Sequence, residues 1–228
     1  ALQDLSLTLD KGDFVTVIGS NGAGKSTLFN AITGAFFPDR GLIMLGGEDI
    51  TYQQEHVRSK VIGHLFQDPL KGTAPHMTIE ENMALAYLRT TTSRNAYFSR
   101  INAADKKKFR EQLALLDMGL EDRMKQPVGL LSGGQRQALT LLMATMVTPK
   151  ILLLDEPTRG IDVGAKAEIY QLINNLAKQG MAIIVVSSEL PEVIGISDRI
   201  VTFCEGELTG EYLQEEATQE KLLQSATK

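Results

Sequence analysis

Apolar and polar positions along the chain follow two different periods. Wholly apolar or alternating short runs predict strands, and apolar residues every three or four positions predict helices. Strands are predicted at residues 5–9, 14–18, 42–45, 61–66, 151–154, 182–186, 200–204 and 208–212. Helices are predicted at 28–33, 78–88, 103–118, 132–147, 163–178, 191–196 and 216–225, with a loop at 90–99. Buried strands separated by helices predict an α/β fold with a mostly parallel core sheet.

The order of these elements predicts two parts. Between residues 77 and 147 the pattern is helical throughout and interrupts the alternation of strands and helices. The runs at 5–9 and 14–18 are joined by a short turn, which predicts antiparallel strands near the N-terminus. We therefore expect a core formed by residues 1–76 and 148–228, into which residues 77–147 are inserted as an all-helical subdomain.

A glycine-rich segment lies between the predicted strand at 14–18 and the predicted helix at 28–33. It has the G-x-x-x-x-G-K-[ST] spacing of a phosphate-binding loop. Its residues are Gly19, Ser20, Asn21, Gly22, Ala23, Gly24, Lys25, Ser26 and Thr27. The glycines allow N–H groups to converge on anionic oxygens, and the following helix adds its positive end. Lys25 is expected to reach the β- and γ-phosphates and Ser26 to ligate Mg²⁺, so the segment predicts nucleotide binding by a P-loop NTPase fold.

Two carboxylates follow the apolar run at 151–154. Taken alone, an apolar strand that ends in Asp155 and Glu156 is as often structural as functional. Downstream of a phosphate-binding loop, Asp155 is expected near Mg²⁺, with its strand lying beside the loop's own strand. Glu156 is then placed to accept a proton from an attacking water.

Another helix start and a lone glutamine are further candidates. Ser132, Gly133, Gly134 and Gln135 open the predicted helix at 132–147, which is either a second anion site or a plain helix cap. Gln67 follows the strand at 61–66, and its amide oxygen is a candidate ligand for Mg²⁺ or for the attacking water. By itself, such a glutamine is more often structural.

Composition narrows the class of protein. The net charge of −5 disfavours nucleic acid as the main partner, and the lysine run at 106–108 is expected to be a solvated helix face. The single cysteine, Cys204, lies in an apolar run and is expected to be a buried thiol in a reducing compartment. Because no apolar stretch reaches 18 residues, we expect a chain that does not cross a membrane but could dock on a protein that does.

Together, these motifs resemble the nucleotide-binding domain of ABC transporters. The matching segments are the phosphate-binding loop at 19–27, Gln67, the signature at 131–135, the carboxylates ending 152–156, and Ile161 with Asp162. The resemblance implies an ATPase with a RecA-like core that uses ATP and Mg²⁺ on the cytoplasmic side of the membrane. It also implies that two such domains pair head to tail, so that Ser132–Gln135 and Asp162 complete the partner's ATP site. The helical subdomain and the Gln67 region would contact membrane-spanning permease subunits.

The chain departs from the family pattern in three places. Ser188 stands where the family has a histidine that contacts the γ-phosphate, so hydrolysis is expected to be slower. No strand with an adenine-stacking aromatic is expected ahead of Leu5. Met143 lies near the place of a usual arginine, which favours packing over an ion pair.

The resemblance also divides along the chain. Residues 1–155 are similar to ATPase subunits of amino-acid-type bacterial importers, and residues 156–228 to the C-terminal ATPase half of ribose-type importers. This favours a mosaic joined near residues 155–157, with one unusual natural subfamily as the alternative. We expect the ATP-hydrolysing subunit of an importer. An ATP-binding module that hydrolyses little, because of Ser188, and an ABC ATPase that acts on nucleic acid are the alternatives.

Overall fold

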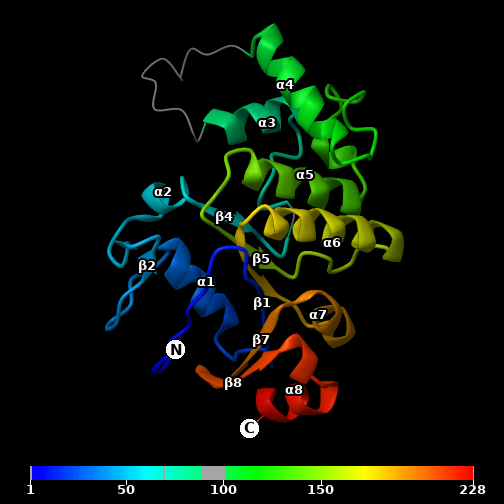
Figure 1. Cartoon of the computed structure of the whole chain (residues 1–228). Coiled ribbons are helices and arrows are strands. Elements are labelled where there is room, and N and C mark those ends of the chain that lie inside the picture. The colour runs from blue at the N-terminus through cyan, green and yellow to red at the C-terminus, as the bar shows by residue number, and fades with distance from the viewer. Residues whose placement is uncertain (1, 69, 89–100, 228) are drawn as a thin grey trace. The chain divides into compact units, whose positions relative to one another are not determined.

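The computed structural model describes residues 2–68, 70–88 and 101–227, so the predicted loop at 90–99 lies outside the described residues. The fold is α/β, as predicted (Figure 1). By contacts, the chain forms two compact units. The first contains residues 1–64, 149–157 and 173–228, and the second contains residues 65–148 and 158–172.

A six-stranded sheet forms the first unit, in the order β4-β5-β6-β1-β7-β8. Its strands are β1 (Phe14–Gly19), β4 (Ile62–Leu65), β5 (Ile151–Asp155), β6 (Ala182–Val186), β7 (Arg199–Cys204) and β8 (Glu207–Leu213). β1 pairs in parallel with β6 and β7, β5 pairs in parallel with β6, and β7 pairs with β8 in antiparallel. The prediction that β5 lies beside β1 is wrong, because β6 lies between them.

The antiparallel strands predicted near the N-terminus are only partly present. Residues 5–9 form no strand, although Leu5, Leu7 and Leu9 are half-buried against the core cluster. Alternation in this segment therefore reflects burial of one face and not pairing with a neighbour. The antiparallel pair in this part of the chain is the small hairpin of β2 (Met44–Leu45) and β3 (Glu48–Asp49).

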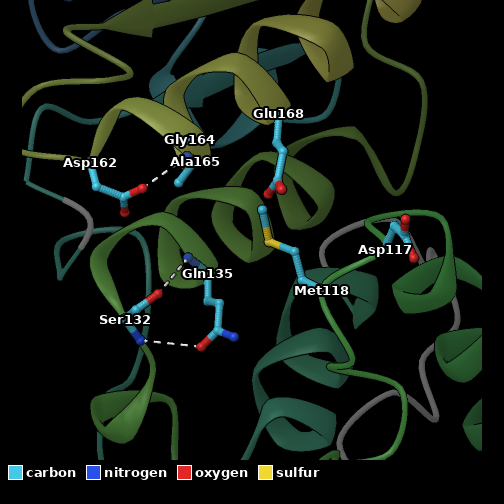
Figure 2. Close-up of a pocket in the computed structure, with 8 residues that line it drawn as sticks. All are labelled: Asp117, Met118, Ser132, Gln135, Asp162, Gly164, Ala165 and Glu168. Atoms are coloured by element: carbon cyan, nitrogen blue, oxygen red, sulfur yellow. Dashed lines mark hydrogen bonds between the residues drawn. The ribbon is translucent and has the colours of Figure 1, made fainter.

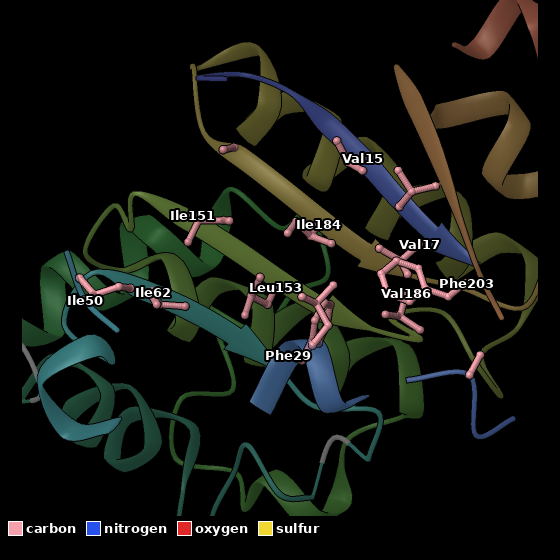
Figure 3. Close-up of a cluster of buried hydrophobic side chains, with 14 residues drawn as sticks. Val15, Val17, Phe29, Ile50, Ile62, Ile151, Leu153, Ile184, Val186 and Phe203 are labelled. Atoms are coloured by element: carbon pink, nitrogen blue, oxygen red, sulfur yellow. The ribbon is translucent and has the colours of Figure 1, made fainter. Parts of the chain in front are cut away.

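Alternate residues of the central strand contact helices on its two faces. Val15 and Val17 of β1 pack with Phe29 of α1 (Lys25–Thr33) in the cluster shown in Figure 3. Ile18 packs in a second cluster with Val193 of α7 (Leu190–Ile196) and with α8 (Gln219–Ala226). Because both faces of the sheet are covered there, the inner strands β1, β5 and β6 are almost wholly apolar.

A buried arginine connects α1 to the segment that follows it. Arg58 ends the short helix α2 (Glu55–Arg58) and is 0% exposed. Its guanidinium donates to the carbonyl oxygens of Ala31 and Ile32 in the last turn of α1, at 2.7 and 2.8 Å. It also donates to the carbonyls of Thr51 and Gln53, at 2.7 and 2.9 Å. A cation thus satisfies carbonyls at the negative end of α1.

The second unit contains α3 (Ile79–Leu88), α4 (Ala103–Ala114), α5 (Gly133–Thr145), a 3-10 turn at Val128–Leu130 and the first part of α6 (Val163–Lys178). The Thr78–Glu81 pair caps α3 with bonds in both directions. The helix predicted at 103–118 ends early, because the chain turns through Asp117, whose φ is +53°. Within the part of the chain that the structure describes, no helix is both long and apolar enough to cross a membrane.

His64 of β4 is expected to make stability depend on pH. Burial lowers its pKa from 6.5 to about 4, and its ring lies edge-on to Phe29 with centroids 5.8 Å apart. Between about pH 6.5 and pH 4, His64 is therefore protonated in the unfolded chain but neutral in the folded chain. The free energy of unfolding falls as the pH is lowered through this range. Between pH 7 and 5 we expect a loss of up to about 2 kcal/mol. Urea unfolding should show that the free energy of unfolding of His64→Gln depends less on pH than that of the unaltered chain. The exposed control His56→Gln should keep the pH dependence of the unaltered chain.

Candidate functional site

The glycine-rich segment forms a tight loop between β1 and α1. At Gly19 a Cβ atom would come within 2.4 Å of the Phe203 carbonyl oxygen, so a side chain cannot fit there. At Gly24 the backbone φ is +108°, a conformation that residues with side chains rarely adopt. This loop delivers the chain directly into the first turn of α1, where backbone N–H groups have no partner within the helix. The local geometry is that of an anion-binding loop.

Lys25 opens α1 and folds back onto the loop. Its ammonium donates to the carbonyl oxygens of Gly19 and Ser20, at 2.7 and 2.9 Å. Burial lowers the pKa of Lys25, and the charges of Glu156 and Asp155 oppose that shift. A cation therefore lies in the loop within the field of both carboxylates, although β6 separates their strand from β1.

Glu156 occupies a turn just beyond β5. Its N–H donates to the Val186 carbonyl at 2.8 Å and so extends the pairing of β5 with β6 by one residue. Its φ is +48°, in the left-handed region that is uncommon for residues other than glycine. The Glu156 Oε2 atom accepts hydrogen bonds from the N–H and the hydroxyl of Ser188, at 3.2 and 3.1 Å. Sequence reasoning placed both residues at the site but did not foresee this contact.

The signature residues lie in the second unit, at the start of α5. Ser132 caps the helix, with its hydroxyl accepting from the Gln135 N–H and the Gln135 side chain accepting from the Ser132 N–H. Asp162 caps α6 by accepting from the Ala165 N–H at 3.0 Å. The two helix starts and Glu168 of α6 line a shared pocket (Figure 2). The volume of this pocket is about 340 Å³. The capping geometry is present, and a role in binding phosphate stays a prediction.

Gly134 is expected to tolerate no side chain, for a reason unrelated to phosphate. A Cβ there would lie 2.6 Å from the Cβ of Ala165, because α5 and α6 approach closely at this point. We expect Gly134→Ala to destabilise the fold by about 1–3 kcal/mol through overpacking. The matched control is Gly133→Ala, since nothing lies within 4 Å of its Cβ position. Equal melting temperatures for the two variants would contradict this account.

For the other candidate residues, the structure gives a position in the fold and an exposure. Ser26 is exposed on the first turn of α1, and Asp155 is half-buried at the carboxyl end of β5. Gln67 is exposed two residues after β4 and belongs to the second unit, whereas the phosphate-binding loop belongs to the first. Its proposed role in ligating Mg²⁺ or water therefore stays a prediction. Sequence reasoning missed Arg58, and no local pattern in the sequence signals its burial, since Glu55 lies three positions before it on the same short helix.

A phosphate-binding loop between the first strand and helix of a parallel sheet, with carboxylates at the end of another strand, defines a P-loop NTPase. The family model described as ABC transporter matches residues 2–159 of this chain. The chain belongs to the ABC transporter family, whose ATP-binding domains are ATPases.

Relatives and solved structures agree with this family. The chain is 39% identical over 227 residues to the ribose import ATP-binding protein RbsA of Oceanobacillus iheyensis, which covers 98% of this chain. The chain spans only 45% of the length of that relative. Because one relative aligns on both sides of residues 155–157, the similarity does not require two parents, and the mosaic origin stays a hypothesis.

Two solved structures support the fold. The ATP-binding cassette MJ1267 of an ABC transporter, in its ADP conformation, is 27% identical, with a TM-score of 0.83 over 99% of this chain and 91% of that one. The ATP-binding cassette MJ0796, in a dimeric post-hydrolysis state bound to ADP and Pi, is 26% identical, with a TM-score of 0.79 over 93% of this chain and 90% of that one.

Proposed function

We propose that the chain is the ATP-binding and ATP-hydrolysing part of an ABC importer. The observation that carries the proposal is the arrangement of Lys25, Asp155 and Glu156 in the first unit. The lysine lies in the phosphate-binding loop, and the negative charges of the two carboxylates raise the pKa of Lys25 against the lowering caused by burial. Lys25 would pair with the β- and γ-phosphates, and Glu156 would accept the proton of the attacking water. Gln67 would help to position that water.

The donor set suits Mg²⁺. Ser26 and Asp155 offer hydroxyl and carboxylate oxygens, with Gln67 as a further candidate, and Mg²⁺ prefers one or two such ligands together with phosphates and water. Among the described residues, no group of three His, Cys, Asp or Glu side chains could hold a metal alone. When bound, Mg²⁺ would neutralise phosphate charge, and the chain's own residues would orient the nucleotide and hold the base.

The proposed partners are a second nucleotide-binding domain and membrane-spanning permease subunits. The capped starts of α5 and α6 present Ser132–Gln135 and Asp162 at one pocket, where they could meet the nucleotide of a second domain. The relative described as a ribose import ATP-binding protein supports an importer. We propose that ATP-driven pairing of two domains on the cytoplasmic face of the membrane energises it. The proposal names no solute, because in this family other subunits select it.

The test is to measure ATP affinity and Mg²⁺-dependent phosphate release on the purified chain. We expect Lys25→Ala to weaken ATP binding roughly 10- to 100-fold, as loss of a hydrogen bond to a charged group implies. The control is the exposed lysine Lys60, whose change to alanine should leave ATP affinity unchanged. Removing Mg²⁺ with a chelator should stop phosphate release.

Each other result selects a different function. Absence of ATP binding by the unaltered chain would overturn the proposal. ATP binding without turnover would favour the nucleotide-binding module, in which Ser188 limits hydrolysis. Stimulation of turnover by DNA or RNA would favour an ABC ATPase that acts on nucleic acid.

A further inference from the structure

We propose that Ser188 is a positioning residue for the Glu156 carboxylate and makes no contact with the γ-phosphate. The inference rests on the proposed function, because it assigns how the base of that reaction is held. Both residues lie in the first unit, at the carboxyl ends of the adjacent parallel strands β5 and β6. Their contact is a property of the folded chain, since they are 32 positions apart in the sequence.

The backbone conformation at Glu156 directs its side chain towards Ser188. The N–H of Glu156 is held by the Val186 carbonyl at 2.8 Å, so the start of the turn is anchored to β6. The left-handed conformation that follows, with φ of +48°, turns the chain away from the line of β5. Such a conformation is unfavourable for a residue with a side chain, and it persists where surrounding contacts impose it. Here it brings the carboxylate to the residue that lies two positions beyond β6.

Ser188 holds one oxygen of that carboxylate with two donors. Its backbone N–H and its hydroxyl both donate to Oε2, at 3.2 and 3.1 Å. Two donors on a single oxygen restrict rotation of the carboxylate, and hydrogen bonds to an ionised acceptor are stronger than neutral ones. The other oxygen, Oε1, is then the atom that accepts the proton from water.

The Ser188 hydroxyl has no second proton with which to bind the γ-phosphate. A serine hydroxyl carries a single proton to donate, and in this structure Glu156 receives it. The hydroxyl's remaining capacity is as an acceptor, which cannot bind an anionic phosphate oxygen. A serine at this place therefore serves the base, and the charge of the γ-phosphate is left to other groups such as Lys25.

The experiment compares Ser188→Ala, Ser188→Thr and the control Ser187→Ala. The neighbouring Ser187 hydroxyl accepts from the Glu189 N–H at 3.2 Å, so its removal tests the local turn without touching Glu156. For each purified variant, kcat and KM for Mg²⁺-ATP are measured. We expect Ser188→Ala to lower kcat roughly 10- to 100-fold with KM unchanged, Ser188→Thr to restore most of kcat, and Ser187→Ala to have no such effect.

A second measurement separates positioning from phosphate binding. In a Glu156→Gln background, which slows turnover during the titration, the ratio of ATP to ADP affinity should be the same with and without the additional change Ser188→Ala. A lower ratio in the double variant would show a γ-phosphate contact and overturn the inference, as would an unchanged kcat in Ser188→Ala. Failure of the proposed function is distinct, because it appears as an unaltered chain with no turnover at all, and the inference then fails with it.

Discussion

Glu156→Gln is expected to abolish steady-state ATP turnover while ATP binding is retained. The amide keeps the shape of the side chain but cannot take up a proton, and general-base catalysis contributes about 10²- to 10⁴-fold. The Lys25 ammonium is held by the Gly19 and Ser20 carbonyls, and these contacts do not involve Glu156. Nucleotide affinity should therefore change little. Phosphate release under saturating Mg²⁺-ATP and an ATP titration measure the two properties on one sample.

The matched control for this change is Glu205→Gln. Glu205 is also a glutamate in the left-handed region, with φ of +49°, and its side chain is exposed. We expect normal turnover in this variant. That result would show that removing a carboxylate from a left-handed turn does not by itself abolish ATP turnover. Turnover of Glu156→Gln within a few-fold of the unaltered chain would rule out Glu156 as the base and leave Asp155 to be tested.

Arg58→Met is expected to cause the largest loss of stability. Four backbone carbonyls that now accept from the guanidinium would lose that donor, two of them at the end of α1. Because hydrogen bonds to a charged group typically contribute about 1.5–3 kcal/mol, we expect a total loss of about 3–5 kcal/mol. Arg58→Lys should recover little of it, because an ammonium cannot reproduce the planar fork. Urea unfolding at fixed pH gives the free energy of unfolding for each variant.

Arg40→Met is the control, since Arg40 is exposed in the same unit. Its stability should lie within about 0.5 kcal/mol of the unaltered chain, as is usual for surface changes. An Arg58→Met protein as stable as the Arg40→Met protein would mean that other contacts satisfy these carbonyls. Because α1 also carries Lys25, we expect Arg58→Met to weaken ATP binding near its unfolding transition.

Local signals in the sequence were sufficient for much of the fold. The boundaries predicted for α6 and β6 are confirmed, and the start of α5 at Ser132 is correct because a capping box depends on residues three positions apart. Errors occurred where a pattern had two physical causes. Alternation at residues 5–9 predicted a strand, whereas the structure shows half-buried leucines without pairing. The helix predicted at 103–118 ends at Ala114, where a left-handed turn at Asp117 follows.

The sequence by itself determined the class of protein and predicted the glycine-rich loop between β1 and α1 and the carboxylates at the end of β5, because these depend on residues at fixed short spacings. Only the tertiary structure decided which strands are neighbours, since β6 separates β1 from β5. It also decided that Ser188 meets Glu156 and that Arg58 closes the end of α1. Such contacts join residues far apart in the chain, and hydrophobic periodicity carries no information about them. The pairing of β5 with β6 and the backbone turn at Glu156 bring Glu156 and Ser188 together. The strand order and the turn both depend on packing of the whole first unit.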